Sequence, residues 1–452
     1  MLYGNTDQID ITPSLGTLIN GEFTTRYANK IADPLFAKAI YMHDGKTKLL
    51  IMVVDICVMK RDFLDSLKAG IEQSIGVAAS NQLISSTHAH STGSIADLLM
   101  GHIDLAYRNQ LAEKLLKLAT LVVQKEQKIK IAFGKVLKPD HLTSRRYRMK
   151  DSYQPRNPVL KTVDAVKTNP FGYESEIIEP TSIPDPEVCF IGIKNGSDEW
   201  IGLLANYGLH YVGDCERGTI TADYFGYFSN KIASLLNSNR IVSMMSNGTS
   251  GEVNIWDFID GDRYPKNYHE KSKYIGEDIA EAVFNSIDGL SWETEADLEV
   301  LYQEISLNKR LISPDLLKES YAILAKTDYE AVAYTDKDLY EKVYAREQVL
   351  LESIPQQIFF PVQCFRIGKV LLGGLGGEFF SASGKALKQE SDFYFSICLA
   401  NDYVGYVPPA NEFINGGYET WRCRSSFLEE NAEEKVIACM LSMIKKLKSN
   451  ER

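Results

Sequence analysis

The sequence predicts an α/β protein in which mixed β-sheets are flanked by helices. Apolar, strand-like runs alternate with segments of helical periodicity through the first half of the chain. Some runs are almost continuously apolar, as in strands buried on both faces, whereas others alternate like strands with one wet face. No internal repeat, low-complexity tract or Gly/Ser-rich linker divides the chain. These observations favour layers of sheet and helix around a shared core.

The elements of the first half follow from these two periodicities. The run KLLIMVVDICVM at 48–59 is almost continuously apolar and is bounded by charge, which is typical of a buried strand. Further strands are expected at 81–87, 128–136, 188–195, 200–209 and 240–247. Helices are expected at 61–76, 107–127, 223–238 and 269–287.

Residues 137–186 interrupt this alternation. They are rich in Pro, Arg, Tyr and Asn and show little periodicity. An irregular stretch of this length inside a compact protein usually lines or covers a site. Beyond the first half, strands are expected at 295–307, 359–376 and 394–400, and helices at 313–326, 335–353, 381–389 and 429–447.

The size and charge of the chain restrict its organisation and its partners. We expect a single unit over 1–452, in which two intimately packed lobes span about 1–290 and 291–452. The formal net charge of -11 leaves no excess of Lys and Arg to neutralise phosphates, so we expect no nucleic-acid partner.

Cysteine usage and the N-terminal sequence indicate the compartment. The 7 cysteines are scattered and include no C-x-x-C pair, which is typical of a reducing compartment rather than a disulfide framework or a thiolate zinc site. The first residues contain no basic start and no apolar signal region. The longest apolar run falls short of the roughly 20 residues that a membrane span needs. We therefore expect no transmembrane segment and a cytoplasmic protein, or a periplasmic or secreted one if a leader has been removed.

Two histidines directly follow the expected strand at 81–87. In an extended chain alternate residues share a face, so His88 and His90 could point the same way. Two imidazoles suit one metal ligand and one proton carrier. Taken alone the pattern is weak, because a pair of surface histidines looks the same.

His210 and Glu378 each follow another apolar run. Ligands of α/β proteins gather at strand carboxyl ends, where loops carry function. A lone histidine in such a place is more often structural than a ligand. A carboxylate after a glycine-rich strand is costly to bury unpaired, but it can also stabilise the start of a helix. The Tyr-rich segment at 401–420 follows a further strand, and alone it indicates an aromatic surface loop.

Read together, these segments resemble the neutral/alkaline ceramidase family. The resemblance extends over nearly the whole chain and follows the order of the family's motifs. It rests on DITP at 10–13, THAHS at 87–91, YGLHYV at 207–212, ITAD at 220–223, GEVN at 251–254, GEF at 377–379, and Tyr406 with the YE at 418–419.

The resemblance implies a zinc-dependent hydrolase that cleaves an N-acyl (amide) bond of a lipid or small molecule by attack of metal-activated water. It implies one Zn²⁺ per chain, with His88, His210, Glu378 and Tyr406 at the ligand positions. The other implied residues are His90 as a proton carrier, Tyr418 as a donor to the oxyanion, Arg145 or Arg146 as the family's arginine, Asn254 at the catalytic position in GEVN, and Asp223 and Glu252 as substrate-binding residues.

This chain departs from the family pattern in two ways. The family's functional serine appears here as Asn254, and an amide cannot be deprotonated into a nucleophile, which excludes a covalent serine mechanism at this position. Asn254 could still bind the substrate carbonyl or position water. The chain also ends where family members continue into an immunoglobulin-like domain. Three functions therefore stay open: a ceramidase-like amidohydrolase, a ligand-binding module that has lost catalysis, and a zinc esterase or amidase acting on a small polar substrate.

Overall fold

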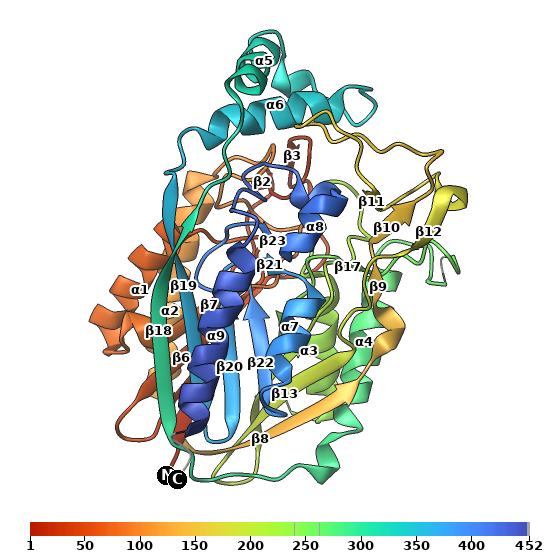
Figure 1. Ribbon diagram of the computed structural model, residues 1–452. Helices are drawn as coiled ribbons and strands as arrows, with labels where there is room; N and C mark the ends of the chain where they lie inside the picture. Colours follow the sequence, from red (N-terminus) through yellow and green to blue (C-terminus); the bar gives the residue numbers. More distant parts are fainter. Residues whose placement is uncertain (239, 262, 450–452) are drawn as a thin grey trace.

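Three groups of four strands surround one apolar core in the computed structural model, which describes residues 1–238, 240–261 and 263–449 (Figure 1). The first group is β1 (Tyr3–Asp10), β5 (Phe36–His43), β6 (Lys48–Val54) and β7 (Gln82–Ser86). The second is β8 (Gln127–Leu137), β13 (Glu187–Asn195), β14 (Trp200–Tyr207) and β16 (Val242–Asn247). The third is β18 (Leu298–Asn308), β19 (Gln357–Ile367), β20 (Val370–Leu375) and β22 (Tyr394–Cys398). Parallel and antiparallel pairs occur together, so the expected fold class is confirmed.

The first two groups form one eight-stranded sheet that turns a corner between β1 and β8. The pairs Tyr3–Lys128 and Gly4–Gln127 join these two strands. A Cβ on Gly4 would lie 2.3 Å from the Tyr41 carbonyl oxygen, so glycine allows the close approach there. Beyond the corner β16 contacts β5, β6 and β7. The two halves therefore face each other, and with the third group they enclose a single core of Ile, Leu, Val, Met and Phe side chains.

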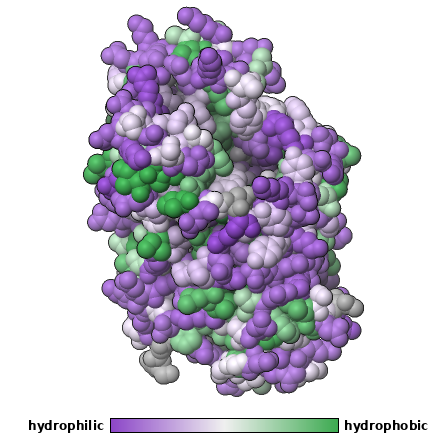
Figure 2. Space-filling model, turned by 90° about the vertical axis from the view of Figure 1, so that its right-hand side faces the viewer, coloured by the Kyte–Doolittle hydropathy of each residue, from purple (hydrophilic) through white to green (hydrophobic). Residues whose placement is uncertain are grey.

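Helices cover the outer face of each group. The first group carries α1 (Arg61–Ile75) and α2 (Leu105–Gln124), the second α3 (Asp223–Leu235) and α4 (Glu270–Phe284), and the third α7 (Ser381–Lys388) and α9 (Ala432–Ser449). Figure 1 shows α5 (Pro314–Leu324) and α6 (Leu339–Leu351) stacked at the upper end, above α8 (Ala410–Asn415). Among the described residues, none of these helices combines the length and the apolar character that crossing a bilayer requires. Figure 2 shows a largely hydrophilic face with small, separate apolar groups.

Each group contains one parallel strand pair joined by a crossover helix. The three units are β6–α1–β7, β14–α3–β16 and β20–α7–β22. Parallel neighbours require such a crossover, and loops at the carboxyl ends of their strands are free to carry polar groups. The fold therefore offers three strand-end positions of the same kind, one from each group.

The structure differs from the sequence prediction at three places. Residues 359–376 form a hairpin of β19 and β20, not one strand, with its turn at Gly368, where φ is +59°. β1 and β5 lie in the first 47 residues, where no strand was predicted. β1 carries Asn, Thr, Asp and Gln along most of its length, whereas β5 is a largely apolar run that could have been predicted. The irregular stretch 137–186 contains a small sheet of β10 (Arg146–Met149), β11 (Val166–Thr168) and β12 (Ile177–Pro180).

Two-residue strands complete the connections between these elements. They are β2 (Leu18–Ile19), β3 (Arg26–Tyr27), β4 (Lys30–Ile31), β9 (Thr143–Ser144), β15 (Thr219–Ile220), β17 (Val253–Asn254), β21 (Glu378–Phe379) and β23 (Tyr406–Val407).

Candidate metal centre and cavity

The three crossover units each deliver one potential metal ligand to a common point. His88 follows β7, His210 follows β14, and Glu378 follows β20. Their ligand atoms all lie within 4.8 Å of one another. The Glu378 Oε2 atom is 3.4 Å from His88 Nε2 and 3.3 Å from His210 Nε2. All three side chains are buried.

The neighbouring parallel strands orient the two imidazoles. The Nδ1 atom of His88 lies 2.9 Å from the Cys57 carbonyl oxygen, beyond β6. The Nδ1 atom of His210 lies 3.0 Å from the Ser250 carbonyl oxygen, beyond β16. A carbonyl can only accept, so each Nδ1 carries a proton, and Nε2 is the nitrogen of each ring that is directed toward the centre. Metal-binding histidines are commonly oriented in this way.

The third unit orients the carboxylate by the same arrangement. Tyr403, which follows β22, donates its hydroxyl to Glu378 Oε1 at 2.8 Å. This leaves Oε2 facing the imidazoles. Tyr406, the fourth predicted ligand, lies opposite Glu378 in the parallel pair β21–β23 and lines the same cavity as His210.

The donor set fits a divalent cation. His210 Nε2 and Glu378 Oε2 are buried without a hydrogen-bond partner, whereas most buried polar atoms in folded proteins have one. Burial alone would raise the pKa of Glu378, but the positive charge of the protonated His88 ring outweighs it and lowers that pKa well below its usual value. The carboxylate is therefore anionic. Burial alone would likewise lower the pKa of His88, but Glu378 raises it to about 10, so a metal ion bound here would displace the Nε2 proton. Two nitrogens and an anionic oxygen are donors that zinc accepts.

His90 lies beside this centre, but not because of strand alternation. β7 ends at Ser86, and His88 has a left-handed backbone with φ of +69°. This bend brings the Nε2 atoms of His88 and His90 to 3.2 Å. The His90 ring stacks on Tyr211 at 3.8 Å between centroids, and its Nδ1 atom has no partner. Burial lowers the pKa of His90 well below its usual value, so this ring is neutral.

A cavity of about 350 Å³ opens over the centre. His90, His210, Tyr406, Tyr418 and Arg145 all line it. Its wall also contains residues that we did not predict, and these are largely aromatic or polar: Glu22, Phe23, Lys167, Thr168, Asn169, Phe171, Tyr211, Tyr334, Tyr340 and Trp421. The irregular stretch 137–186 supplies several of them, and its composition was the signal that could have indicated them.

The structure separates the two candidate arginines. Arg145 lines the cavity, with its guanidinium 5.1 Å from the ring centroid of Tyr406 and 5.8 Å from that of Tyr418. Arg146 is fully buried and pairs with Glu419 and Glu412 at 2.6 and 2.8 Å. Glu419 also accepts from Arg145 Nε at 2.7 Å, so one buried carboxylate holds both arginines.

Asp223 and Glu252 are not among the residues that line the cavity. Asp223 accepts from the backbone N–H groups of Val212 and Gly213 and thereby fixes the loop after His210. Glu252 accepts from the Ser381 N–H at the start of α7, at 3.0 Å. Asn254 is also buried away from the cavity, and its side chain is bonded to Thr143, Trp256 and Asn169.

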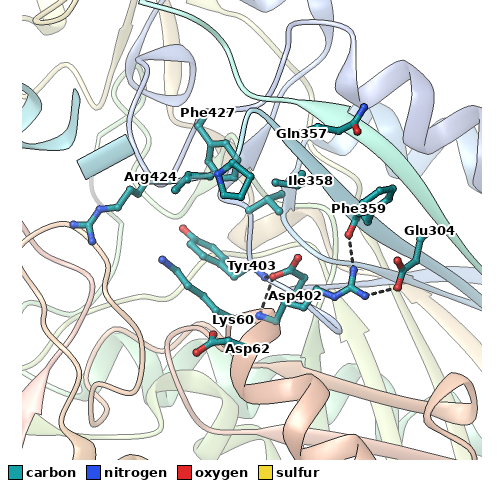
Figure 3. Close-up of a pocket in the computed structure, with 14 residues that line it drawn as sticks. Lys60, Asp62, Glu304, Gln357, Ile358, Phe359, Asp402, Tyr403, Arg424 and Phe427 are labelled. Carbon is teal, nitrogen blue, oxygen red and sulfur yellow. Dashed lines mark hydrogen bonds and ion pairs between the residues drawn. The ribbon is translucent and has the colours of Figure 1, made fainter. Parts of the chain in front are cut away.

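A second cavity, of about 430 Å³, is lined by Tyr403 (Figure 3). Its apolar wall includes Ile358 and Phe427, and its polar wall includes Lys60, Arg61, Asp402 and Arg424. Lys60 donates to the Asp97 carbonyl at 2.7 Å, and Arg424 pairs with Glu347 at 2.7 Å. None of the described residues in this wall has a buried polar side-chain atom without a partner.

Known proteins resemble this chain in structure but not in sequence. No protein-family model and no curated protein matches the sequence. Among solved structures, neutral ceramidase from Pseudomonas aeruginosa matches with a TM-score of 0.72 and 13% identity, over 99% of this chain and 74% of that one. A ceramidase complexed with C2 matches with a TM-score of 0.70 and 13% identity, over 99% and 75%. The chain therefore has the fold of the neutral ceramidases.

Proposed function

We propose that this protein is a metal-dependent hydrolase that cleaves an N-acyl amide bond. One observation carries the proposal: His88, His210 and Glu378 converge beneath a cavity with buried donor atoms that lack partners. These residues, with Tyr406, would hold one zinc ion per chain. Zinc bound there would supply Lewis acidity and the means to activate water at neutral pH.

The remaining side chains have roles that their positions support. His90 is neutral and lines the cavity, so it can accept a proton and return it to the leaving amine. Arg145 and Tyr418 present donors to the same space, where negative charge on the substrate oxygen would develop. Asp223, Glu252 and Arg146 hold neighbouring backbone and side chains in place. The resemblance to ceramidases favours a lipid amide, whereas the polar cavity wall leaves room for smaller N-acyl compounds.

Metal content and turnover test this function together. Protein purified without chelators should contain about one zinc per chain, measured by mass spectrometry of the metal. It should hydrolyse at least one member of a panel of lipid amides and short N-acyl compounds, and chelation should abolish that turnover. His210→Ala should lose both metal and turnover, whereas His102→Ala, at a histidine whose side chain is 47% exposed, should keep both.

Two results would contradict the proposal. Absence of tightly bound metal would remove its basis. Metal or ligand binding without turnover of any member of the panel would instead indicate a binding module that has lost catalysis.

A further inference from the structure

Asn254 uses all of its side-chain polar groups inside the protein. Its Oδ1 atom accepts from the Trp256 backbone N–H at 3.1 Å and from the Thr143 hydroxyl at 2.9 Å. A backbone N–H can only donate, so this contact identifies the oxygen end of the amide. The other end, Nδ2, donates to Asn169 Oδ1 at 2.6 Å. With 5% of its surface exposed, Asn254 acts on the cavity through Asn169.

Asn169 is the member of this pair that lines the cavity. Because its Oδ1 accepts from Asn254, its Nδ2 is the end left to face a ligand. Its backbone is fixed on both sides: its N–H donates to the Arg145 carbonyl at 2.8 Å, and its carbonyl accepts from the Phe171 N–H at 2.8 Å. Its φ of +48° is left-handed, a conformation that Asn tolerates better than most residues. The amide is therefore held in one orientation before any ligand arrives.

The position of this amide suits a hydrogen bond to substrate. Arg145 accepts the backbone hydrogen bond of Asn169, and it also lines the cavity over the metal centre. Lys167 and Thr168 precede it in the same wall. A neutral N–H donor at this place can bond to an oxygen acceptor, such as the carbonyl or a hydroxyl of an N-acyl compound.

We propose that Asn169 is a substrate-binding residue whose Nδ2 donates to a carbonyl or hydroxyl oxygen of the N-acyl substrate, and that Asn254 is the positioning residue that sets its orientation. This inference rests on the proposed function. It also gives Asn254 a role at the position where the ceramidase pattern has a serine: the side chain selects which end of a neighbouring amide faces the substrate.

Exchanging donor and acceptor in the hydrogen bond between Asn254 and Asn169 tests whether the two residues orient the substrate or only stabilise the fold. Asn254→Asp keeps the acceptor for Trp256 and Thr143 but replaces the donor to Asn169 with an oxygen. The Asn169 amide should then turn over, donate to the new carboxylate, and present Oδ1 to the cavity. Asn169→Asp makes the same change directly, and Asn169→Ala removes the group. Asn237→Ala is the matched control, because Asn237 has φ of +47° and is exposed outside the cavity.

The experiment measures kcat, KM and binding for the 4-nitroanilides of acetate, butyrate and octanoate, with binding followed by ligand-observed NMR. If the hydrogen bond is equally strong in the ground state and the transition state, Asn169→Ala should lower kcat/KM about fivefold to tenfold. KM should then rise while kcat stays unchanged. The loss should reach roughly 100-fold and fall in kcat if the bond strengthens at the transition state. Asn254→Asp and Asn169→Asp should lose at least as much, with unchanged metal content, whereas Asn237→Ala should stay within twofold of the parent.

The outcomes distinguish this inference from the proposed function. If the parent protein turns over a probe and the Asn169 and Asn254 variants stay within twofold of it, the inference is overturned and the function stands. If the parent binds a probe without turnover, the proposed function fails, and the dissociation constants of the variants decide the inference. A parent that hydrolyses another member of the panel but neither binds nor hydrolyses these three probes overturns the inference alone, and a parent that hydrolyses nothing and binds none of the probes overturns both.

Discussion

The cavity over the metal centre and the second cavity, which Tyr403 lines, differ in chemistry more than in size. The second is the larger, at about 430 Å³ against 350 Å³, yet its cations and carboxylates are paired with groups of the protein itself. The first contains nitrogens of His90 and His210 that have no partner. Leaving a buried polar atom unpaired costs roughly 1–3 kcal/mol, and at the first cavity such atoms lie beside other potential metal ligands. Buried ligand atoms without a hydrogen-bond partner therefore identify the candidate site better than the volume of a cavity does.

The difference follows from how the fold supplies each wall. Three crossover units with the same arrangement deliver His88, His210 and Glu378, and a group beyond the neighbouring strand orients each of them. The second cavity is lined by the start of α1, one end of β19, the loop 402–404 after β22 and the loop that contains Arg424. The charged residues of the second cavity form ion pairs with neighbouring side chains of the protein, such as Arg61 with Glu304 and Arg424 with Glu347, and these pairs stabilise the packing of the helices and strands.

The largest expected effect comes from removing the buried glutamate that pairs with the arginines beside each cavity. Glu419 pairs with Arg145 and Arg146 beside the first cavity. Glu347 pairs with Arg424 beside the second cavity. Both glutamates are 0% exposed. Glu419→Ala and Glu347→Ala should each lower the free energy of unfolding by about 3–5 kcal/mol, because a buried guanidinium loses its partner. Urea denaturation measures this loss.

Turnover should separate these two variants. Glu419→Ala should also reduce turnover per folded molecule, because Arg145 is no longer held at the cavity wall. Glu347→Ala should leave that turnover unchanged. Equal losses of turnover in both variants would show that the second cavity is not independent of the first.

A second effect concerns Tyr403, which lines the second cavity and is bonded to the metal ligand Glu378. Tyr403→Phe keeps the ring but removes the donor to Glu378 Oε1. Loss of such an orienting bond typically weakens metal binding 10- to 100-fold, and competition with a chromophoric chelator measures it. Tyr394→Phe removes a buried hydroxyl bonded to Ser396 in β22 and should leave zinc affinity unchanged. An unaltered affinity in Tyr403→Phe would mean that this hydroxyl does not orient the ligand.

A pH-dependent effect is expected in the second cavity. Burial raises the pKa of Asp402 to about 6 from 3.8. The folded state therefore binds this proton more tightly than the unfolded state, which stabilises the fold fully below about pH 4, and the stabilisation is lost as pH rises through 6. Relative to Asp402→Asn, the parent should lose about 2 kcal/mol of unfolding free energy between pH 4.5 and 7.5.

Chemical denaturation at several pH values measures that difference. Ile358→Val, in the same wall, introduces and removes no ionisable group and should show a stability difference from the parent that does not vary with pH. A constant difference for Asp402→Asn as well would mean that this carboxyl titrates normally in the folded state.

The sequence indicated much of the fold because most strands and helices carry a clear apolar periodicity. The run that became β6 and the amphipathic segment that became α1 are examples. β1 was missed because its polar side chains mask the pattern, although its pairing with β5 extends over its whole length. The β19–β20 hairpin was missed because its turn depends on a single left-handed glycine within an apolar run.

The site was predictable where a side chain interrupts an apolar strand end. His88, His210 and Glu378 do so, and the structure brings them together. The groups that orient the imidazoles were not predictable, because they are backbone carbonyls and any residue could supply them. Asn169 was hidden for a related reason: its importance depends on a left-handed backbone and on a bond to Asn254, and neither has a local sequence signal.

The smallest expected effect uses two glycines with nearly identical backbones. Gly21 has φ of +92° and Gly45 has φ of +94°, so alanine should strain either one by about 1–2 kcal/mol. A Cβ on Gly21 would lie 2.5 Å from His90 Nδ1, whereas one on Gly45 would meet nothing within 4 Å. Gly21→Ala should therefore displace the His90 ring and lower kcat about 10-fold, with zinc content unchanged because the three converging ligands are not moved. Gly45→Ala should carry a similar backbone strain without the clash, and it should keep full turnover. If both variants lose turnover equally, backbone strain explains the loss, and the position of the His90 ring does not limit the reaction.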